Sequence, residues 1–193
     1  MNIVPLLLFV LALAPLHMAD ASQRPCPGVP HVSTEVACRS ACGTKFMYDL
    51  CINAMRRGGI DPSPSHTEET TVYAMLAGNQ TITSYDKTYD AMLAQWRDNT
   101  SLSGPERDTY DGCMDDYVES ENFLYAIIER DLPNCLFSSL HKEFREAMNS
   151  LENCRDRMLA PWISWPPLLP MVESDRNNVV LAYFLARLLE AVR

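Results

Sequence analysis

Seven cysteines are the residues whose type and spacing carry the clearest chemistry in this chain. In an oxidising compartment most cysteines pair as disulfides, and an odd number leaves at least one thiol over. A zinc site would instead need a second short cysteine pair or suitably spaced histidines. Cys38 and Cys42 form one short pair, but the histidines after residue 21 are scattered, at His31, His66 and His141. We therefore expect structural disulfides, with no metal centre and no cofactor. The cysteines are Cys26, Cys38, Cys42, Cys51, Cys113, Cys135 and Cys154.

Carboxylates and histidine offer little support for catalysis. Asp115 and Asp116 are adjacent, and Glu119 and Glu121 follow shortly after them. Such a cluster on a helix more often forms a solvated face than a general acid and base. His141 has no evident nucleophile beside it, and the chain lacks the nucleophile-elbow, zincin and phosphate-loop motifs. We expect no catalytic residues and predict that the chain is not an enzyme.

The first 21 residues have the pattern of a secretory signal. Residues 3–14 are almost wholly apolar, and Ala19-Asp20-Ala21 offers a small-x-small cleavage site. A membrane anchor is the alternative, but this run has only about 12 residues where a span needs roughly 20. We predict a signal peptide over residues 1–21, an N-terminal arm over residues 22–33 and one domain over residues 34–193.

The charge of the chain limits the classes of partner that it is expected to bind. Its formal net charge is −9, and no cluster of basic residues is larger than Arg56-Arg57. Binding to nucleic acid or to an anionic membrane is therefore not expected. An acidic surface suits a basic protein partner, although solubility alone explains it equally well.

Two sequons are candidate glycosylation sites in a secreted chain, Asn79-Gln80-Thr81 and Asn99-Thr100-Ser101. Asn99 lies near a predicted helix end and is the better acceptor. Asn79 falls close to a predicted apolar face, where we expect it to stay bare.

Helical periodicity dominates the rest of the chain. A short helix is predicted from Thr34, its candidate N-cap, to residue 41, and a second turn over residues 48–55. Apolar residues at three-four spacing then predict long helices, and no alternating run predicts a strand. Pro105 suits the first helical position after a cap at Ser103 or Gly104. The long helices are expected over residues 67–97, 105–132, 137–159 and 174–192.

Short connections between these helices predict an all-α, up-down-up-down four-helix bundle with a disulfide-stapled N-terminal helical hairpin. Cys113 lies near the start of the second long helix and Cys154 near the end of the third, both on apolar seams. Antiparallel neighbours place those two ends side by side. We therefore expect a Cys113–Cys154 disulfide.

With these elements in this order, the chain resembles the plant invertase and pectin methylesterase inhibitor family. The resemblance runs from near Val36 to the C-terminal helix and covers most of the chain after the signal. It implies a four-helix bundle with an N-terminal helical hairpin and two disulfides, Cys42–Cys51 and Cys113–Cys154. The matching motifs are the Cys-x8-Cys that ends in Tyr48-Asp49-Leu50-Cys51, the Cys113-x3-Tyr117 helix, Cys154, and the leucine-rich final helix Val179–Val192.

The resemblance also implies a function. Members of the family bind pectin methylesterases or acid invertases stoichiometrically and block the substrate cleft without chemistry of their own. A secreted protein of the cell wall, or of the vacuole, would follow. The alternative is a secreted helical binding module of the same fold that inhibits neither enzyme.

The sequence departs from the family pattern in its extra cysteines, Cys26, Cys38 and Cys135. We expect a Cys26–Cys38 disulfide beside Cys42–Cys51, which leaves Cys135 as a free thiol. Cys38 competes with Cys42 as the partner of Cys51, because some relatives have a longer loop there.

Two further segments bear on recognition. Some invertase inhibitors carry a Pro-Lys-Phe triplet early in the third bundle helix, and here that stretch is Phe137-Ser138-Ser139-Leu140. Its absence argues against invertase inhibition by that contact but does not establish pectin methylesterase as the target. Trp162 and Trp165 lie in a proline-rich loop, where they would either cap the end of the bundle or anchor a partner.

Overall fold

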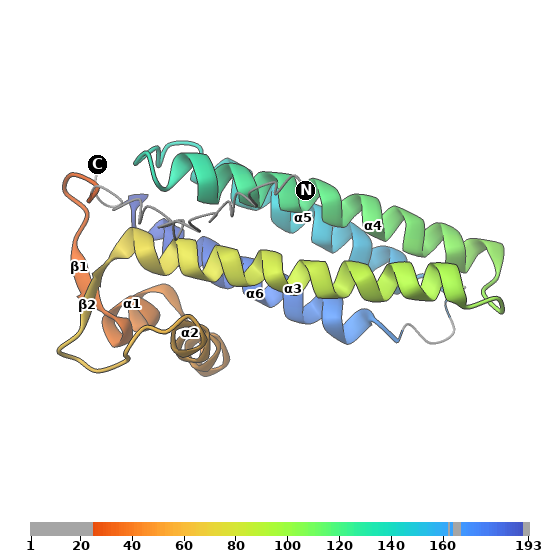
Figure 1. Cartoon of the computed structure of the whole chain (residues 1–193), viewed down its shortest axis with the longest axis horizontal. Coiled ribbons are helices and arrows are strands. Elements are labelled where there is room, and N and C mark those ends of the chain that lie inside the picture. Colours follow the sequence, from red (N-terminus) through yellow and green to blue (C-terminus); the bar gives the residue numbers. More distant parts are fainter. Residues whose placement is uncertain (1–24, 162, 164–166, 191–193) are drawn as a thin grey trace, which may run out of the picture.

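Four long helices form the body of the protein (Figure 1). The computed structural model describes residues 25–161, 163 and 167–190, so the predicted signal peptide lies outside the described residues. In the described part of the chain, no helix has the length and apolar content that a bilayer crossing requires. The long helices are α3 (Thr70–Asp98), α4 (Gly104–Tyr125), α5 (Leu140–Met158) and α6 (Leu169–Arg187).

The predicted all-α bundle is confirmed. Helices α3 and α4 pack together, α4 packs on α5, α5 on α6, and α6 returns to α3. Figure 1 shows all four running side by side along the longest axis. Because the four helices contact one another in this cyclic order, the α3/α4 side of the bundle lies opposite the α5/α6 side.

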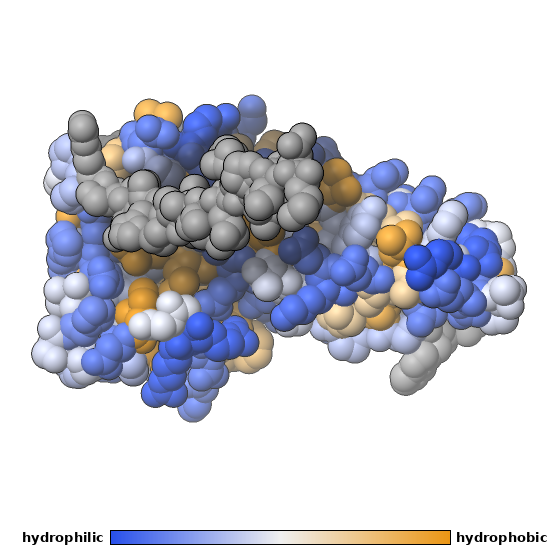
Figure 2. All heavy atoms as spheres, viewed as in Figure 1, coloured by the Kyte–Doolittle hydropathy of each residue, from blue (hydrophilic) through white to orange (hydrophobic). Residues whose placement is uncertain are grey.

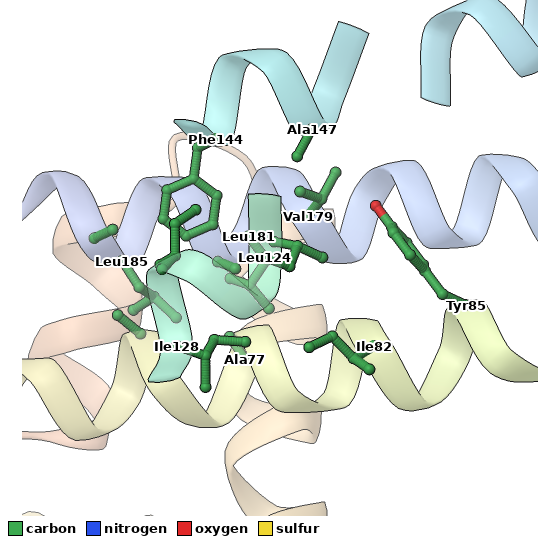
Figure 3. Packing of buried hydrophobic residues seen from close by; sticks show 14 of the residues in the cluster. Ala77, Ile82, Tyr85, Leu124, Ile128, Phe144, Ala147, Val179, Leu181 and Leu185 are labelled. Atoms are coloured by element: carbon green, nitrogen blue, oxygen red, sulfur yellow. The ribbon is translucent and has the colours of Figure 1, made fainter. Parts of the chain in front are cut away.

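The core consists of the apolar stripes of the four helices. Phe144 of α5 and Leu124 of α4 are completely buried and point toward Leu185 of α6 (Figure 3). At Gly78 of α3, an added Cβ atom would lie 2.7 Å from the side chain of Ile128. The glycine therefore leaves room for this isoleucine, and alanine would force it to move.

Local sequence signals explain where the helices begin. Ser103 and Glu106 form a reciprocal capping box at the start of α4, which confirms Ser103 as the cap. Helix α6 begins at Leu169, five residues before the predicted start at Ser174. Pro170 concealed this start, but proline is tolerated in the first turn, where its missing N–H has no partner to lose.

The predicted second long helix ends in a wider turn. After α4 the chain continues as a π-helix, η1 (Ala126–Asp131). The N–H of Leu132 donates to the carbonyl of Ile127 over 2.9 Å, which is the five-residue spacing of a π-turn. Both Ile127 and Ile128 remain buried, so this turn keeps the apolar seam on the core.

The prediction of no strand was wrong. Strand β1 (His31–Ser33) pairs antiparallel with β2 (Thr67–Glu69). Three residues are too few to show alternation, and the acids of β2 resembled the first turn of a helix. The pair is extended by the Thr70 hydroxyl, which donates to the carbonyl of Pro30 over 2.9 Å, and by the Tyr73 hydroxyl, which donates to that of Val32 over 2.7 Å.

A helical hairpin lies beside one end of the bundle (Figure 1). It consists of α1 (Thr34–Ala41) and α2 (Lys45–Arg57), and both helices contact α3 and α6. The cap of α1 is Ser33 rather than the predicted Thr34, whose side chain is buried. Thr44 caps α2 by accepting the N–H of Met47, so this helix starts three residues before the predicted turn.

Candidate binding surface

The hairpin disulfide joins Cys38 to Cys51, with Cα atoms 5.7 Å apart. The expected Cys42–Cys51 and Cys26–Cys38 bonds are therefore wrong. Cys38 lies within α1 on the face packed against α2 and is fully buried, as is Cys51. Cys42 follows the last residue of α1 and is the free thiol. Its partial burial raises its pKa to about 11, which leaves it protonated at neutral pH.

The expected free thiol at Cys135 is also wrong, because Cys135 pairs with Cys26. The arm runs to the end of the bundle where η1 leads into α5. There the Cys26 N–H donates to the buried carboxylate of Glu69 over 3.0 Å. Cys135 adopts a left-handed φ of 58°, which turns the chain after Leu132. This bond ties the arm to the bundle across 109 residues of sequence.

Helices α4 and α5 are connected by a disulfide and by an ion pair. The Cys113–Cys154 disulfide is confirmed. One turn further along α4, Asp116 accepts from Arg157 of α5 over 3.0 Å. Burial raises the pKa of Asp116, and the arginine only partly opposes that effect. Gly112 gives the arginine room, since a Cβ atom there would lie 3.0 Å from the guanidinium.

A buried carboxylate ties α6 to both α3 and α4. Asp175 is almost fully buried and accepts three hydroxyl hydrogen bonds. Tyr117 donates to it over 2.8 Å and Thr88 over 2.5 Å, and Ser84 donates as well. Burial raises the pKa of Asp175, while these hydrogen bonds favour its ionised form. Sequence reasoning missed this residue, because the late predicted start of α6 made it an ordinary acid of a helix N-terminus.

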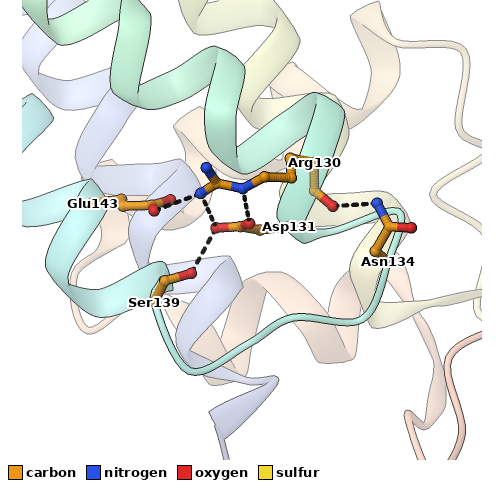
Figure 4. Close-up of polar contacts among 5 residues, drawn as sticks. All are labelled: Arg130, Asp131, Asn134, Ser139 and Glu143. Atoms are coloured by element: carbon orange, nitrogen blue, oxygen red, sulfur yellow. Dashed lines mark hydrogen bonds and ion pairs between the residues drawn. The ribbon is translucent and has the colours of Figure 1, made fainter.

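A second polar cluster fixes the connection between η1 and α5 (Figure 4). Arg130 donates to Asp131 over 2.6 Å and to Glu143 over 2.7 Å, and Ser139 donates to Asp131 over 2.6 Å. Burial would raise the pKa of Asp131, but the hydrogen bonds from Arg130 and Ser139 outweigh it and hold this pKa below its ordinary value. Asn134 closes the turn by donating to the carbonyl of Arg130. These contacts hold the backbone of η1, of the following turn and of the start of α5 in place.

The candidate catalytic groups are not brought together. Asp115 is exposed, Asp116 is paired with Arg157, and Glu119 accepts from Ser150 over 3.0 Å. His141 lies on α5, where its Nδ1 atom is 2.7 Å from the hydroxyl of Tyr183. Within the described residues, no three His, Cys, Asp or Glu side chains are grouped as metal ligands would be.

The two sequon asparagines differ in accessibility, in the opposite order to that expected. Asn79 is exposed on α3, whereas Asn99 is partly buried at the C-cap of that helix. The Asn99 side-chain oxygen accepts from both the N–H and the hydroxyl of Ser101. Trp162 and Trp165 lie outside the described residues.

Hydrophilic side chains cover most of the face in Figure 2, with small apolar patches between them. Two hollows in the surface are relevant to binding. A cleft of about 680 Å³ lies between the hairpin and the loop that contains Asp61 and Pro62. A narrower groove of about 200 Å³ lies between α3 and α4.

No family model and no curated protein matches the sequence. The fold, in contrast, is similar to that of a solved pectin methylesterase inhibitor from Arabidopsis, determined in a mutant form. The match has a TM-score of 0.62 and covers 80% of this chain and 95% of the inhibitor, at 11% sequence identity. The chain thus has the fold of that inhibitor over nearly the inhibitor's full length.

Proposed function

We propose that this protein is a secreted inhibitor that binds a carbohydrate-acting enzyme of the plant cell wall, a pectin methylesterase or an acid invertase. One molecule would block the substrate cleft of one enzyme and do no chemistry itself. The likeness of the whole fold to a pectin methylesterase inhibitor is the observation that carries this proposal.

The construction of the bundle supports such a role. The Cys113–Cys154 disulfide, the Asp116–Arg157 ion pair and the Ser120 hydroxyl, which donates to the carbonyl of Ala147 over 2.9 Å, all join α4 to α5. A surface held in this way loses little conformational freedom on docking, so more of the contact energy remains as affinity. The exposed polar positions of α4 and α5 are therefore part of the proposed inhibitory surface.

An inhibition assay tests the proposal. The purified, oxidised protein is mixed with a plant pectin methylesterase and, separately, with an acid invertase, at acidic and at neutral pH. We expect one enzyme to lose activity in proportion to added inhibitor, with an end point at one-to-one stoichiometry. Full activity of both enzymes under all conditions would overturn it. Boiled, reduced protein is the matched control.

A second candidate is a binding module of the same fold that inhibits neither enzyme. The start of α5 favours it, because Ser139 and Leu140 stand where the Pro-Lys-Phe contact of some invertase inhibitors would lie. Capture from cell-wall extract distinguishes the two functions. Recovery of another protein, together with a negative inhibition assay, would favour the module.

A further inference from the structure

The groove between α3 and α4 differs from the rest of the polar surface in what lines it. Its floor consists of Tyr85 and Tyr117, one from each helix. Asp86 and Tyr89 line it from α3, and Val118 and Glu121 from α4. It therefore combines aromatic rings, an aliphatic side chain and two carboxylates within about 200 Å³.

The floor of this groove is rigid. The rings of Tyr85 and Tyr117 pack against each other with their centroids 5.0 Å apart. Their hydroxyls point inward, where Tyr85 lies 3.0 Å from the hydroxyl of Ser120 and Tyr117 donates to Asp175. Because both rings are held at two ends, a bound group would meet a surface that is already ordered.

The rim includes an apolar side chain that is open to solvent. Val118 is 46% exposed, and Tyr125, two turns further along α4 and beyond the lining of the groove, is 41% exposed. Tyr89 contributes a half-buried ring from α3. Large apolar side chains at such exposure offer a partner contact area that costs little to dehydrate.

The two carboxylates of the groove lack cations. Neither Asp86 nor Glu121 belongs to an ion pair within the described part of the chain, and the neighbouring Lys87 pairs with neither. Burial raises the pKa of Glu121, and the charge of Asp86 raises it further. A positive group placed between them would oppose both effects, because it favours the ionised carboxylates.

The larger cleft beside the hairpin does not share this property. Its acids already have partners, because Glu35 accepts from Arg39 and Asp49 from Lys45. Asp61 accepts the N–H of Ser63 over 2.9 Å. Of these two hollows, the α3/α4 groove is the one whose acids have no cationic partner among the described residues.

We propose that the α3/α4 groove accepts a lysine or arginine side chain from the basic surface of a folded protein partner. Its aliphatic stem would pack on Val118 and the ring of Tyr89, as amphipathic side chains do, and its cation would sit between Asp86 and Glu121. The identity of that partner as the target enzyme rests on the proposed inhibitory function. The proposal that the groove recognises a cationic side chain does not depend on that function.

The first test removes the two charges and keeps the shape. Asp86→Asn with Glu121→Gln is compared with Asp98→Asn and Glu173→Gln, two exposed acids of α3 and α6 that do not line the groove. With the enzyme that the wild type inhibits, we expect the groove variant to raise the inhibition constant by about tenfold or more. The control pair should change it by less than about twofold, since its charges do not meet the partner.

Equal inhibition by the groove variant and the wild type would overturn the groove as the docking site and leave the proposed function standing. Unchanged melting temperatures of both variants exclude misfolding as the cause of any loss.

The second test needs no enzyme. Tetralysine is titrated into the isotopically labelled wild type at low salt, and the Val118 methyl signals, the Tyr89 ring signals and the backbone amide signals are followed by NMR. We expect saturable shifts at Val118 and Tyr89 that vanish in the Asp86→Asn, Glu121→Gln variant and persist in the control pair. Shifts spread evenly over all acidic positions, or unchanged in the groove variant, would overturn the proposal even if inhibition is found.

Discussion

The N-terminal extension and the four-helix bundle of this protein are held together by different means. Two of the three disulfides involve cysteines of the extension. Its hydrogen bonds pair two short strands and link carbonyl groups of the extension to hydroxyl groups of α3. The bundle contains a continuous core with Phe144 and Leu151 fully buried, and one disulfide. A short hairpin buries too little apolar surface to order itself, so covalent bonds supplement the few side chains, such as Met55, that it buries against the bundle.

The largest effect should come from the core of the bundle. Phe144→Ala leaves a cavity beside Leu124 and Leu185, and we expect it to lower the free energy of unfolding by about 3–5 kcal/mol. Urea denaturation measures this loss. Phe46→Ala in the hairpin is the control: Phe46 is 61% exposed, and its loss should stay within about 0.5 kcal/mol. Similar losses in both variants would contradict the role of Phe144 as a buried residue of the bundle core.

Removal of the arm disulfide should loosen the extension alone. Cys26→Ser with Cys135→Ser should cost roughly 2–4 kcal/mol, the typical contribution of a disulfide. Hydrogen exchange locates the effect: amides of β1 and α1 should exchange faster, while those of α5 keep their protection. Cys113→Ser with Cys154→Ser is the matched crosslink removal and should loosen α4 and α5 instead. Identical exchange patterns in the two double variants would show that the two disulfides do not stabilise different regions.

Two buried acids should give opposite pH dependences. The raised pKa of Asp175 means that its contribution is fully present below the unfolded pKa of about 3.9 and is lost as pH rises through the folded value. Asp175→Asn should therefore destabilise most at acidic pH. Its effect, about 1–3 kcal/mol there, should shrink toward neutral pH.

Asp131 has a lowered pKa, so its contribution is present above about 3.9 and is lost as pH falls through the folded value. Asp131→Asn should destabilise most at neutral pH and least near pH 3. Urea denaturation of both variants and the wild type at pH 3, 5 and 7 measures the two slopes. If the loss of stability changed with pH in the same direction for both variants, the opposite pKa shifts of Asp175 and Asp131 would be contradicted.

The smallest effect should come from the free thiol. Cys42→Ser should change the free energy of unfolding by less than about 1 kcal/mol, because Cys42 lies at a helix end and is only partly buried. In the wild type, iodoacetamide should label this thiol slowly at pH 7 and faster as pH approaches its pKa of about 11. Mass spectrometry identifies the labelled cysteine. Label on Cys38 instead would show that Cys42 is the partner of Cys51.

The bundle could be predicted because its signals are local and repeated. The stripe of α5, from Leu140 through Phe144 to Cys154, is buried along its whole length, as its three-four spacing indicated. The Cys113–Cys154 pair followed from the antiparallel packing of two such stripes.

The failures concern features that depend on contacts between distant segments. Cys38 and Cys42 are one helical turn apart, so only the end of α1 after Ala41 decides which faces Cys51. The strands contain three residues each and exist through their pairing with one another. Asp86 is exposed and lines a groove that only the packing of α4 against α3 creates, so helical periodicity alone does not point to it.

The Cys26–Cys135 bond also determines what a protease would accomplish. Residues 58–66 form the connection between α2 and β2, and several of them are exposed. A single cut there would divide the described chain into a hairpin fragment and a bundle fragment. Because Cys26 and Cys135 fall on opposite sides of the cut, the two fragments would remain one molecule until the bond is reduced. A single cut in this connection would therefore nick the chain without releasing either fragment.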